Sequence, residues 1–192
     1  MTDLHIRPET PGDREEIRKV LLASFGDDEG SRIVKVLVSL READHLRIGL
    51  VAERAGALVG YVAVSHAWLD ARQALVDVLV LSPLAIHPES QDQGVGSRLV
   101  SAVVHRAGAA GAPLVFLEGS PEYYGPHGFV KASDKGVLRP SERIPDAAAQ
   151  VVLLGNYEDW MTGRLIYPEA WWRLDLAGLR DPELAEAEAR LG

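Results

Sequence analysis

Gln91-Asp92-Gln93-Gly94-Val95-Gly96 separates a predicted strand from a predicted helix, and it is the most informative segment of the chain. Before it, residues 75–86 form an almost unbroken apolar run, which is typical of a central strand buried on both faces. After it, residues 94–109 carry an apolar residue at every fourth position, which predicts a helix packed on a sheet. A helix start offers unpaired N–H donors and partial positive charge, and glycines let an anion approach the backbone. This geometry therefore suits a pyrophosphate.

A short glycine motif of this kind has more than one interpretation. Taken alone, Gly-x-Gly at a helix start is more often a plain turn from loop to helix. The dinucleotide-binding fingerprint requires a third glycine, whereas position 99 is Leu99. The phosphate loop of nucleoside triphosphatases is excluded because no Gly-Lys-Ser/Thr follows. The surrounding sequence has to decide between a turn and an anion site.

Pro83 interrupts the apolar run of residues 75–86. A proline cannot donate a hydrogen bond within a central strand ladder, so it predicts a bulge or a local separation of this strand from its neighbour. The sequence therefore predicts an irregular strand directly before the glycine motif.

Strands and helices alternate along the rest of the chain. Strands are expected at 4–7, 47–54, 58–64 with an extension to Trp68, 114–117, 130–138 and 151–154, and helices at 13–25, 31–40, 168–176 and 181–191. Asp13 and Glu16 resemble a capping box at the first helix start, and Ala55-Gly56-Ala57 reads as the turn of a hairpin. Hairpins before the central helix and a β-α-β unit around it predict a mixed α/β sheet.

Composition narrows the function further. The 192 residues fit one domain with its own core, and the absence of cysteine excludes disulfides, Cys-ligated zinc and acyl-cysteine intermediates. A formal net charge of −8 argues against sequence-independent binding of nucleic acid. Residues 1–8 do not read as a secretory signal, and no apolar run is long enough for a membrane span. We therefore expect a cytoplasmic location, with no membrane and no nucleic acid as partner.

Three motifs in order, Pro83-Leu84-Ala85-Ile86-His87-Pro88, Gln91-x-x-Gly94-x-Gly96 and Pro121-x-Tyr123-Tyr124-x-x-x-Gly128-Phe129, resemble the GCN5-related N-acetyltransferase (GNAT) superfamily. Within it the likeness is strongest to the small bacterial branch typified by the YhbS group. The likeness implies the α/β (α+β) GNAT fold, a mixed, mostly antiparallel sheet of about seven strands with a central splayed strand pair and flanking helices. We expect one domain over residues 1–192, with a core at about 4–140 and a C-terminal extension at 141–192.

The resemblance also implies acetyl-CoA as co-substrate. Its pantetheine arm would lie in a slot between residues 75–86 and 114–117. The implied contacts are Leu84, Ala85 and Ile86 for the arm, and Gln91, Asp92, Gln93, Gly94, Val95, Gly96 and Ser97 for the pyrophosphate. No metal is expected, because His45, His66, His87 and His105 are widely separated.

Candidate catalytic residues follow the cofactor segment. Tyr124 aligns with the family tyrosine that protonates the departing thiolate, and Tyr123 is the alternative, although a tyrosine pair is also typical of core packing. A base must deprotonate the amine, and the candidates in descending order are Glu118, Asp77 and His127. Glu118 also fits an exposed strand end, and His127 a solvated or capping residue.

The sequence thus predicts an acyltransferase that moves an acetyl group directly to an amine of a small molecule or peptide. One alternative is a non-catalytic acyl-CoA-binding sensor or regulatory module. Another is a lipid- or peptide-binding surface formed by Trp160, Tyr167, Trp171 and Trp172, which also suit an acceptor pocket, a dimer face or attachment of the C-terminus to the core. The acceptor and the oligomeric state stay open, although a homodimer is common among similar proteins.

Overall fold

The computed structural model describes residues 4–191, so the predicted domain bounds at 1 and 192 lie outside the described residues. The chain forms two compact units. Unit 1 takes in the chain up to Ser65 together with Leu81–Arg106, and unit 2 takes in His66–Val80 and the chain from Ala107 onward. Strands β3 (Ala57–Ala71) and β4 (Leu75–Ile86) contribute to both units, which are described separately below.

Unit 1 contains an antiparallel arrangement in the order β1-β2-β3-β4, with β1 at His5–Pro8 and β2 at Leu46–Arg54. The turn between β2 and β3 has positive φ at both central residues, 52° at Ala55 and 80° at Gly56. This left-handed pair matches the twist of antiparallel strands, and it accounts for the hairpin that the sequence predicts.

Two predicted helices of unit 1 form one element, α1 (Arg14–Glu42), with a break at Gly26, where φ is 79° and ψ is 173°. A short 3₁₀ turn at Pro11–Asp13 precedes it. The helix begins where predicted, but the predicted capping contact is wrong. The Asp13 carboxylate instead accepts hydrogen bonds from the Thr10 N–H (2.7 Å) and from the Arg7 guanidinium (2.8 Å).

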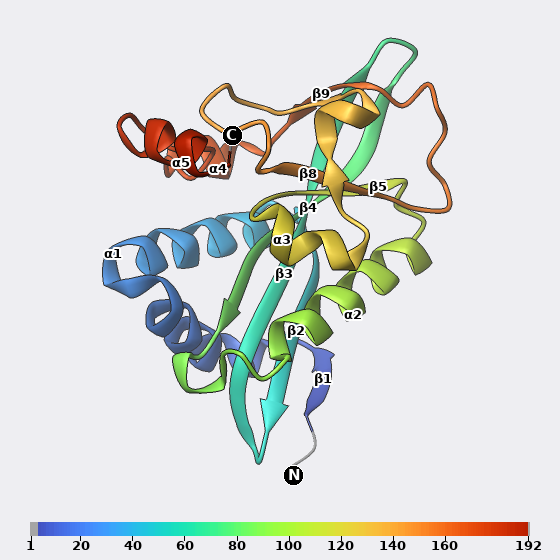
Figure 1. Cartoon of the computed structure of the whole chain (residues 1–192). Coiled ribbons are helices and arrows are strands. Elements are labelled where there is room, and N and C mark those ends of the chain that lie inside the picture. Colours follow the sequence, from blue (N-terminus) through green and yellow to red (C-terminus); the bar gives the residue numbers. More distant parts are fainter. Residues whose placement is uncertain (1–3, 192) are drawn as a thin grey trace. The chain divides into compact units, whose positions relative to one another are not determined.

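Helices α1 and α2 (Val95–Ala109) pack on opposite faces of the unit 1 strands. A Cβ at Gly60 would meet side chains of Val95 and Leu99 on α2 at 3.1 and 3.0 Å. The next residue, Tyr61, accepts a hydrogen bond from Arg41 of α1 at 3.2 Å. Successive residues of a strand point to opposite faces, so the strands lie between the two helices (Figure 1).

Unit 2 contains the strand order β3-β4-β5-β8-β6, and β9 joins β3 on one side and β7 on the other. Its further strands are β5 (Leu114–Glu118), β6 (Val130–Lys131), β7 (Val137–Leu138), β8 (Ala149–Leu153) and β9 (Gly163–Ile166). The β4–β5 and β7–β9 pairs are parallel, whereas β5–β8, β6–β8 and β3–β9 are antiparallel. The main path through the sheet has seven strands in the described residues, with β7 and β9 off it. This sheet, mostly antiparallel, confirms the predicted fold class.

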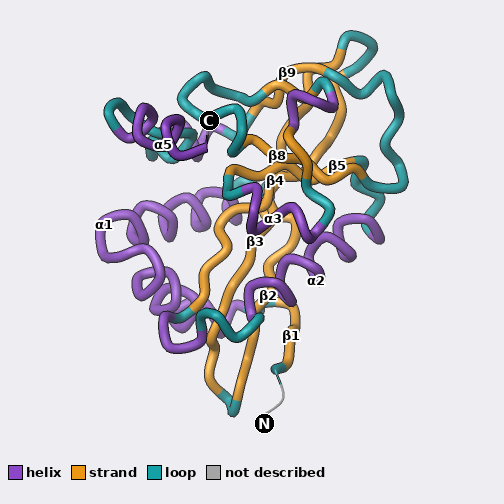
Figure 2. Tube along the Cα trace, in the orientation of Figure 1, coloured by secondary structure: helices purple, strands orange, loops and turns teal. Residues whose placement is uncertain are grey.

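The predicted strand at 130–138 is wrong as one element. It is divided into β6 and β7 by a 3₁₀ turn at Ala132–Lys135, which ends at Gly136 with φ of 71°. Strand β9 has no counterpart among the predictions. Short elements otherwise dominate this unit, namely α3 (Pro121–Tyr124), a 3₁₀ turn at Gly125–His127, α4 (Glu169–Arg173) and α5 (Glu183–Leu191), joined by long loops (Figure 2).

Parallel pairing of β4 with β5 is brief. In the described part of the chain it joins Leu79 to Val115 and Val80 to Phe116, although β5 continues to Glu118. The pairing therefore stops short of Pro83, in agreement with the separation that this proline predicts.

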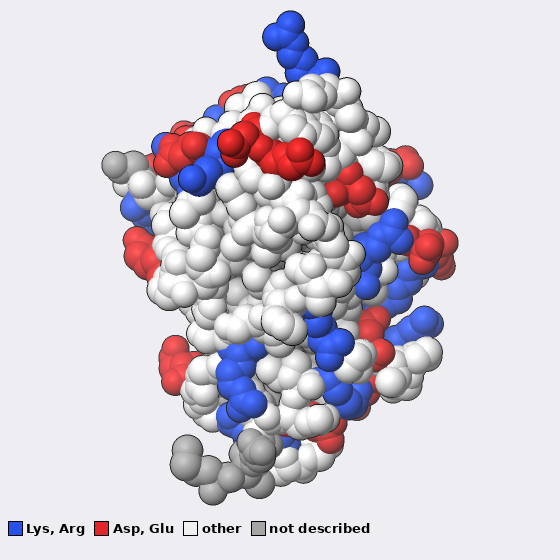
Figure 3. Space-filling model, turned by 90° about the vertical axis from the view of Figure 1, so that its right-hand side faces the viewer, with Lys and Arg blue, Asp and Glu red and all other residues white. Residues whose placement is uncertain are grey.

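Charges of both signs occur on the surface. The face drawn in Figure 3 carries acidic and basic side chains near one another, in a chain whose formal net charge is −8. Among the helices of residues 4–191, none combines the length and apolar character needed to cross a membrane.

Candidate active site

The predicted pyrophosphate loop lies in unit 1 and leads into α2, after a short 3₁₀ turn at Pro88–Ser90. Asp92 and Gly94 have positive φ of 56° and 74°, and a Cβ at Gly94 would meet no atom within 4 Å. The first backbone hydrogen bond of the helix joins the Arg98 N–H to the Gly94 carbonyl at 3.1 Å. The N–H groups of residues 95–97 precede this first intrahelical donor, so they have no acceptor within the helix and are available to an anion.

Side chains of the loop are used to hold its shape. Gln91 donates to the carbonyl of Ile86 at 3.2 Å, and Gln93 donates to the carbonyl of Glu89 at 2.8 Å. The Gln93 side chain also accepts a hydrogen bond from Arg54. Both glutamine side chains of the loop are therefore engaged in contacts within unit 1. Arg54 adds a cation beside the loop that the sequence did not predict.

Val95, Gly96 and Ser97 begin α2. Val95 is buried against Gly60, Gly96 is buried and Ser97 is partly buried. Because the Val95 side chain is held in the core of unit 1, the position of the helix start is fixed by packing.

The end of β4 differs from the prediction at Ile86. Its N–H donates to the Ser24 hydroxyl at 3.0 Å, and that hydroxyl donates to the Ile86 carbonyl at 2.7 Å. The resemblance implies that Ile86 contacts the pantetheine arm, but in this structure a side chain from α1 occupies both backbone polar groups of Ile86. Ala85 is buried and Leu84 is partly buried, and their contacts with a pantetheine arm stay predictions.

Glu118 is the last residue of β5 in unit 2, and its side chain is partly buried. Burial raises the pKa of Glu118 to about 7 against opposing contributions from hydrogen bonds of Tyr167 and the Gly178 N–H and from the charge of Arg143. The Tyr167 hydroxyl donates to Oε1 at 2.8 Å. Glu118 is therefore not the plain exposed strand end of the alternative interpretation, and it can hold or accept a proton near neutral pH.

Three of the four C-terminal aromatics form one cluster around Tyr167. Its ring centroid lies 6.0 Å from Trp171, 6.4 Å from Trp172 and 6.1 Å from Phe116. The Tyr167 side chain is buried, and burial followed by the nearby Glu118 carboxylate raises its pKa well above the usual range. The cluster packs on the core, as one interpretation of the sequence expects, and it also holds the hydroxyl that positions Glu118.

Tyr124 ends α3, and its ring packs edge-on against Tyr123 (4.9 Å) and Phe129 (5.7 Å). Burial, and to a lesser degree the neighbouring Tyr123, raises the pKa of Tyr124, so the phenol is neutral at physiological pH. A Cβ at Gly119 would collide with the Tyr124 ring. The glycine that follows Glu118 therefore provides the space in which the tyrosine ring lies.

The other candidates have different surroundings. Tyr123 is 40% exposed, and the partly buried His127 lies 6.1 Å from its ring, just before Gly128 with φ of 87°. The exposed Asp77 makes a 2.9 Å contact with Nδ1 of the buried His66. Glu118 is the base candidate that borders a pocket and whose pKa burial raises to about 7.

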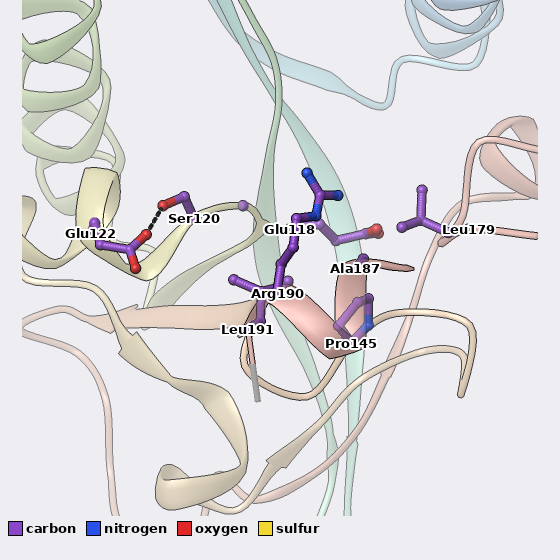
Figure 4. A pocket seen from close by; sticks show the side chains of 10 residues that line it. Glu118, Ser120, Glu122, Pro145, Leu179, Ala187, Arg190 and Leu191 are labelled. Atoms are coloured by element: carbon purple, nitrogen blue, oxygen red, sulfur yellow. Dashed lines mark hydrogen bonds between the residues drawn. The ribbon is translucent and has the colours of Figure 1, made fainter. Parts of the chain in front are cut away.

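Glu118 also borders a pocket of about 540 Å³ in unit 2 (Figure 4). Its apolar lining comprises Pro145, Ala148, Leu179, Ala187 and Leu191. Its polar lining comprises Glu118, Ser120, Glu122 and Arg190, with Gly119 completing the wall. The Ser120 hydroxyl donates to the Glu122 carboxylate, drawn as a dashed line in Figure 4. Gly119 links the base and acid candidates, because it lines this pocket directly after Glu118 and a Cβ at its position would collide with the Tyr124 ring.

No group of three side chains suited to hold a metal ion occurs among residues 4–191. The chemistry that unit 2 can supply with its own residues is proton transfer. Glu118 can accept a proton near pH 7, and Tyr124 can donate one.

Comparisons with known proteins identify the family of the chain. The model of the acetyltransferase (GNAT) domain matches residues 45–131. The uncharacterized N-acetyltransferase YjhQ of Escherichia coli (strain K12) is 32% identical over 129 residues, which cover 67% of this chain and 71% of that protein.

Two solved structures are similar over most of the chain. The GNAT family N-acetyltransferase YhbS from Escherichia coli, in complex with CoA, has a TM-score of 0.81 and 29% identity and covers 93% of this chain and 97% of its own. A GNAT family acetyltransferase from Brucella melitensis, in complex with acetyl-CoA, has a TM-score of 0.71 and 28% identity. The match covers 89% of this chain and 99% of that chain. The family resemblance drawn from the three sequence motifs is confirmed, and the chain belongs to the GNAT family of acetyltransferases.

Proposed function

We propose that this chain transfers the acetyl group of acetyl-CoA directly to an amine of a small molecule or peptide. Family membership supports the reaction type, and the two similar structures contain CoA and acetyl-CoA. The observation that carries the proposal is the start of α2, where backbone N–H groups of residues 95–97 face an open, left-handed turn at Gly94. A diphosphate is the group that this arrangement fits.

The loop residues 91–97 would hold the diphosphate through backbone donors. Arg54, bonded to Gln93 of the loop, adds positive charge beside it. Leu84 and Ala85 of β4 would contact the pantetheine arm. The Ile86 backbone is engaged by Ser24, so contact there requires that the Ser24 hydroxyl moves away.

Glu118 would act as the base. An amine with the usual pKa of about 10.4 is an ammonium at neutral pH and has no free lone pair, so it must lose a proton before it attacks. Glu118 takes that proton, the amine nitrogen forms the new C–N bond, and the C–S bond breaks. A carboxylate with a pKa of about 7 is a better base for this step than an ordinary glutamate.

Tyr124 would act as the acid and donate its phenolic proton to the departing sulfur. Its raised pKa keeps the proton on the oxygen until the thiolate forms. We expect Tyr124→Phe to lower kcat by about 10²- to 10⁴-fold, the usual contribution of a general acid, while the Kd for CoA stays unchanged. Tyr123→Phe is the matched control, and equal kcat losses in the two variants would remove the specific role of Tyr124.

Calorimetric titration with CoA tests the cofactor site. Ser97→Glu places a carboxylate at the start of α2, where the helix dipole tolerates it but a diphosphate is repelled, so we expect Kd to rise by about tenfold or more. Gly108→Glu adds the same charge near the other end of α2, where a Cβ meets no atom within 4 Å, and should leave Kd unchanged. Equal affinity in both variants would contradict the placement of the diphosphate.

The cytoplasmic location, the homodimer and the absence of nucleic-acid or membrane partners stay predictions from the sequence. A sensor that binds CoA without turnover would release no thiol with any amine, which separates that alternative from the proposed enzyme.

A further inference from the structure

We propose that the pocket of unit 2 is the acceptor site and that it takes a small primary amine, bound as the cation, with a compact apolar body and no carboxylate. This assignment rests on the proposed function, because it places the acceptor beside Glu118, the proposed base. It goes further by naming the class of acceptor and the segments that select it.

Size and lining indicate a small, largely apolar body. The pocket volume of about 540 Å³ is within the range that binds small molecules. Five apolar side chains line it, Pro145, Ala148, Leu179, Ala187 and Leu191, and they come from segments far apart in the sequence. A hydrocarbon body of a few carbons up to one ring would bury its surface against them.

The charged groups that line the pocket indicate that the acceptor binds as a cation. The Glu118 carboxylate accepts hydrogen bonds from two neutral donors, the Tyr167 hydroxyl and the Gly178 N–H. The nearby cation Arg143 is bonded to Asp175 at 3.1 Å and so is already compensated. An ammonium bound at Glu118 would place a positive charge against this carboxylate, whose described hydrogen-bond donors are both neutral.

A carboxylate on the acceptor would be disfavoured at the same position. Glu118 and Glu122 both line the pocket and would repel it. Arg190 is the lining cation, but its side chain is exposed, and ion pairs in water contribute little to binding. We therefore expect simple amines to be better acceptors than the corresponding amino acids.

Helix α5 acts as a selectivity wall. Ala187, Arg190 and Leu191 of this helix all line the pocket, as does Glu118 at the end of β5 (Figure 4). The segment that reads in the sequence as an acidic tail therefore sets the space available to the acceptor.

Two substitutions that change the pocket size in opposite directions test the assignment, and the readout is the ratio of kcat/KM for a larger and a smaller amine. Leu179→Ala enlarges the pocket, and Ala187→Val reduces it. For each variant, kcat/KM is measured with 2-phenylethylamine and with 2-methylpropylamine. The preference for the larger amine should rise in Leu179→Ala and fall in Ala187→Val, by about tenfold each, because apolar contacts discriminate at about that level. Glu188→Gln, an exposed change on α5, should leave the ratio as in the wild type.

Matched amino acids test the charge preference. 2-Phenylethylamine and L-phenylalanine differ by one carboxylate, as do 2-methylpropylamine and L-valine. We expect each amine to exceed its amino acid by about tenfold or more in kcat/KM. A preference for the amino acids, or a size ratio that both wall variants leave unchanged, would overturn the assignment while acetyl transfer itself still stands.

Binding of the amine separates the two proposals. Titration of the CoA-bound protein with 2-phenylethylamine should give a Kd that rises about tenfold or more in Glu118→Gln, which keeps a hydrogen-bond acceptor for Tyr167 but loses the charge. If the amine binds and Glu118→Gln weakens that binding, but no amine is acetylated, the proposed function is overturned while the assignment of the pocket as an amine site stands. Binding that Glu118→Gln leaves unaltered would overturn the pocket.

Discussion

Glu118 is subject to opposing influences of which burial is the larger, because burial favours its protonated form whereas its hydrogen-bond donors favour the carboxylate. The loss of either donor should therefore move its titration in a known direction. Tyr167 is the partner that substitution can remove with least disturbance, since phenylalanine keeps the ring packing of the aromatic cluster.

Activity should follow the charge state of Glu118. We expect kcat/KM to rise with pH and to level off above about 7, since the base must be deprotonated. Tyr167→Phe removes a hydrogen bond that lowers the pKa of Glu118, so the midpoint should move to higher pH. Tyr157→Phe is the control and should keep the wild-type midpoint. A pH-rate profile shows the difference, and an unmoved midpoint in Tyr167→Phe would contradict the role of Glu118 as base.

Stability should depend on the same carboxyl group. Its pKa is raised from 4.5 to about 7 in the folded protein, so the folded state holds a proton that the unfolded state loses between these pH values. The free energy of unfolding should thus fall as pH rises from 4.5 to about 7 and stay level above. Glu118→Gln removes this contribution. Urea unfolding of both proteins across this range should show the wild type losing stability relative to the variant, and parallel curves would contradict it.

The sequence could propose Glu118 and Tyr124 as candidates, because Glu118 comes shortly before the third motif and Tyr124 is part of it. It could not identify Tyr167, Arg54 or Ser24 as partners of the site. Their contacts join residues 49, 39 and 62 positions apart, and such pairings depend on the fold. Local patterns carry no information about them.

At the scale of elements, the short segment between β5 and α3 joins the acid and base candidates. Gly119 leaves room for the Tyr124 ring, and its N–H donates to the Ala148 carbonyl at 2.9 Å. Its lack of a side chain is thus a requirement of packing.

Gly119→Ala tests this junction. A Cβ at this position collides with the Tyr124 ring, so the ring must move away from the residue that follows Glu118. We expect kcat to fall by about tenfold or more while the Kd for CoA stays near the wild-type value, since small misplacements of catalytic groups are costly. Gly108→Ala, where a Cβ meets open space, should keep full activity. Steady-state kinetics with one amine and calorimetry with CoA are the measurements, and an unchanged kcat in Gly119→Ala would contradict the junction.

Elements with a strong apolar pattern were predictable. Strand β4 has the predicted bounds, and α2 and β5 differ from theirs by one residue, because their burial on the core imposes long apolar runs or helical spacing. Strand β9 and the turn at Ala132–Lys135 were not. They are only a few residues long, and pairing with β3 and β7 rather than local pattern stabilises β9.

For the whole molecule, the absence of cysteine from all 192 residues favours direct transfer. We expect intersecting lines in initial-rate kinetics with varied acetyl-CoA and amine, because both must be bound together. Protein incubated with radiolabelled acetyl-CoA alone and then denatured should carry no label. Parallel lines, or stoichiometric label on the chain, would indicate a covalent acetyl intermediate.

Two compact units share strands β3 and β4, and each supplies a different part of the proposed activity. Unit 1 provides the backbone donors of the loop, and unit 2 provides the proton-transfer groups and the pocket. The family and the mixed sheet could be predicted from three motifs, whereas the division into units could not, since it reflects contacts that no local segment encodes.

The most direct test of the account is a crystal structure of the chain with CoA bound. We predict that the diphosphate accepts hydrogen bonds from the backbone N–H groups of residues 95–97. A CoA molecule whose diphosphate lies elsewhere, with these N–H groups bonded to water or to protein, would contradict the account.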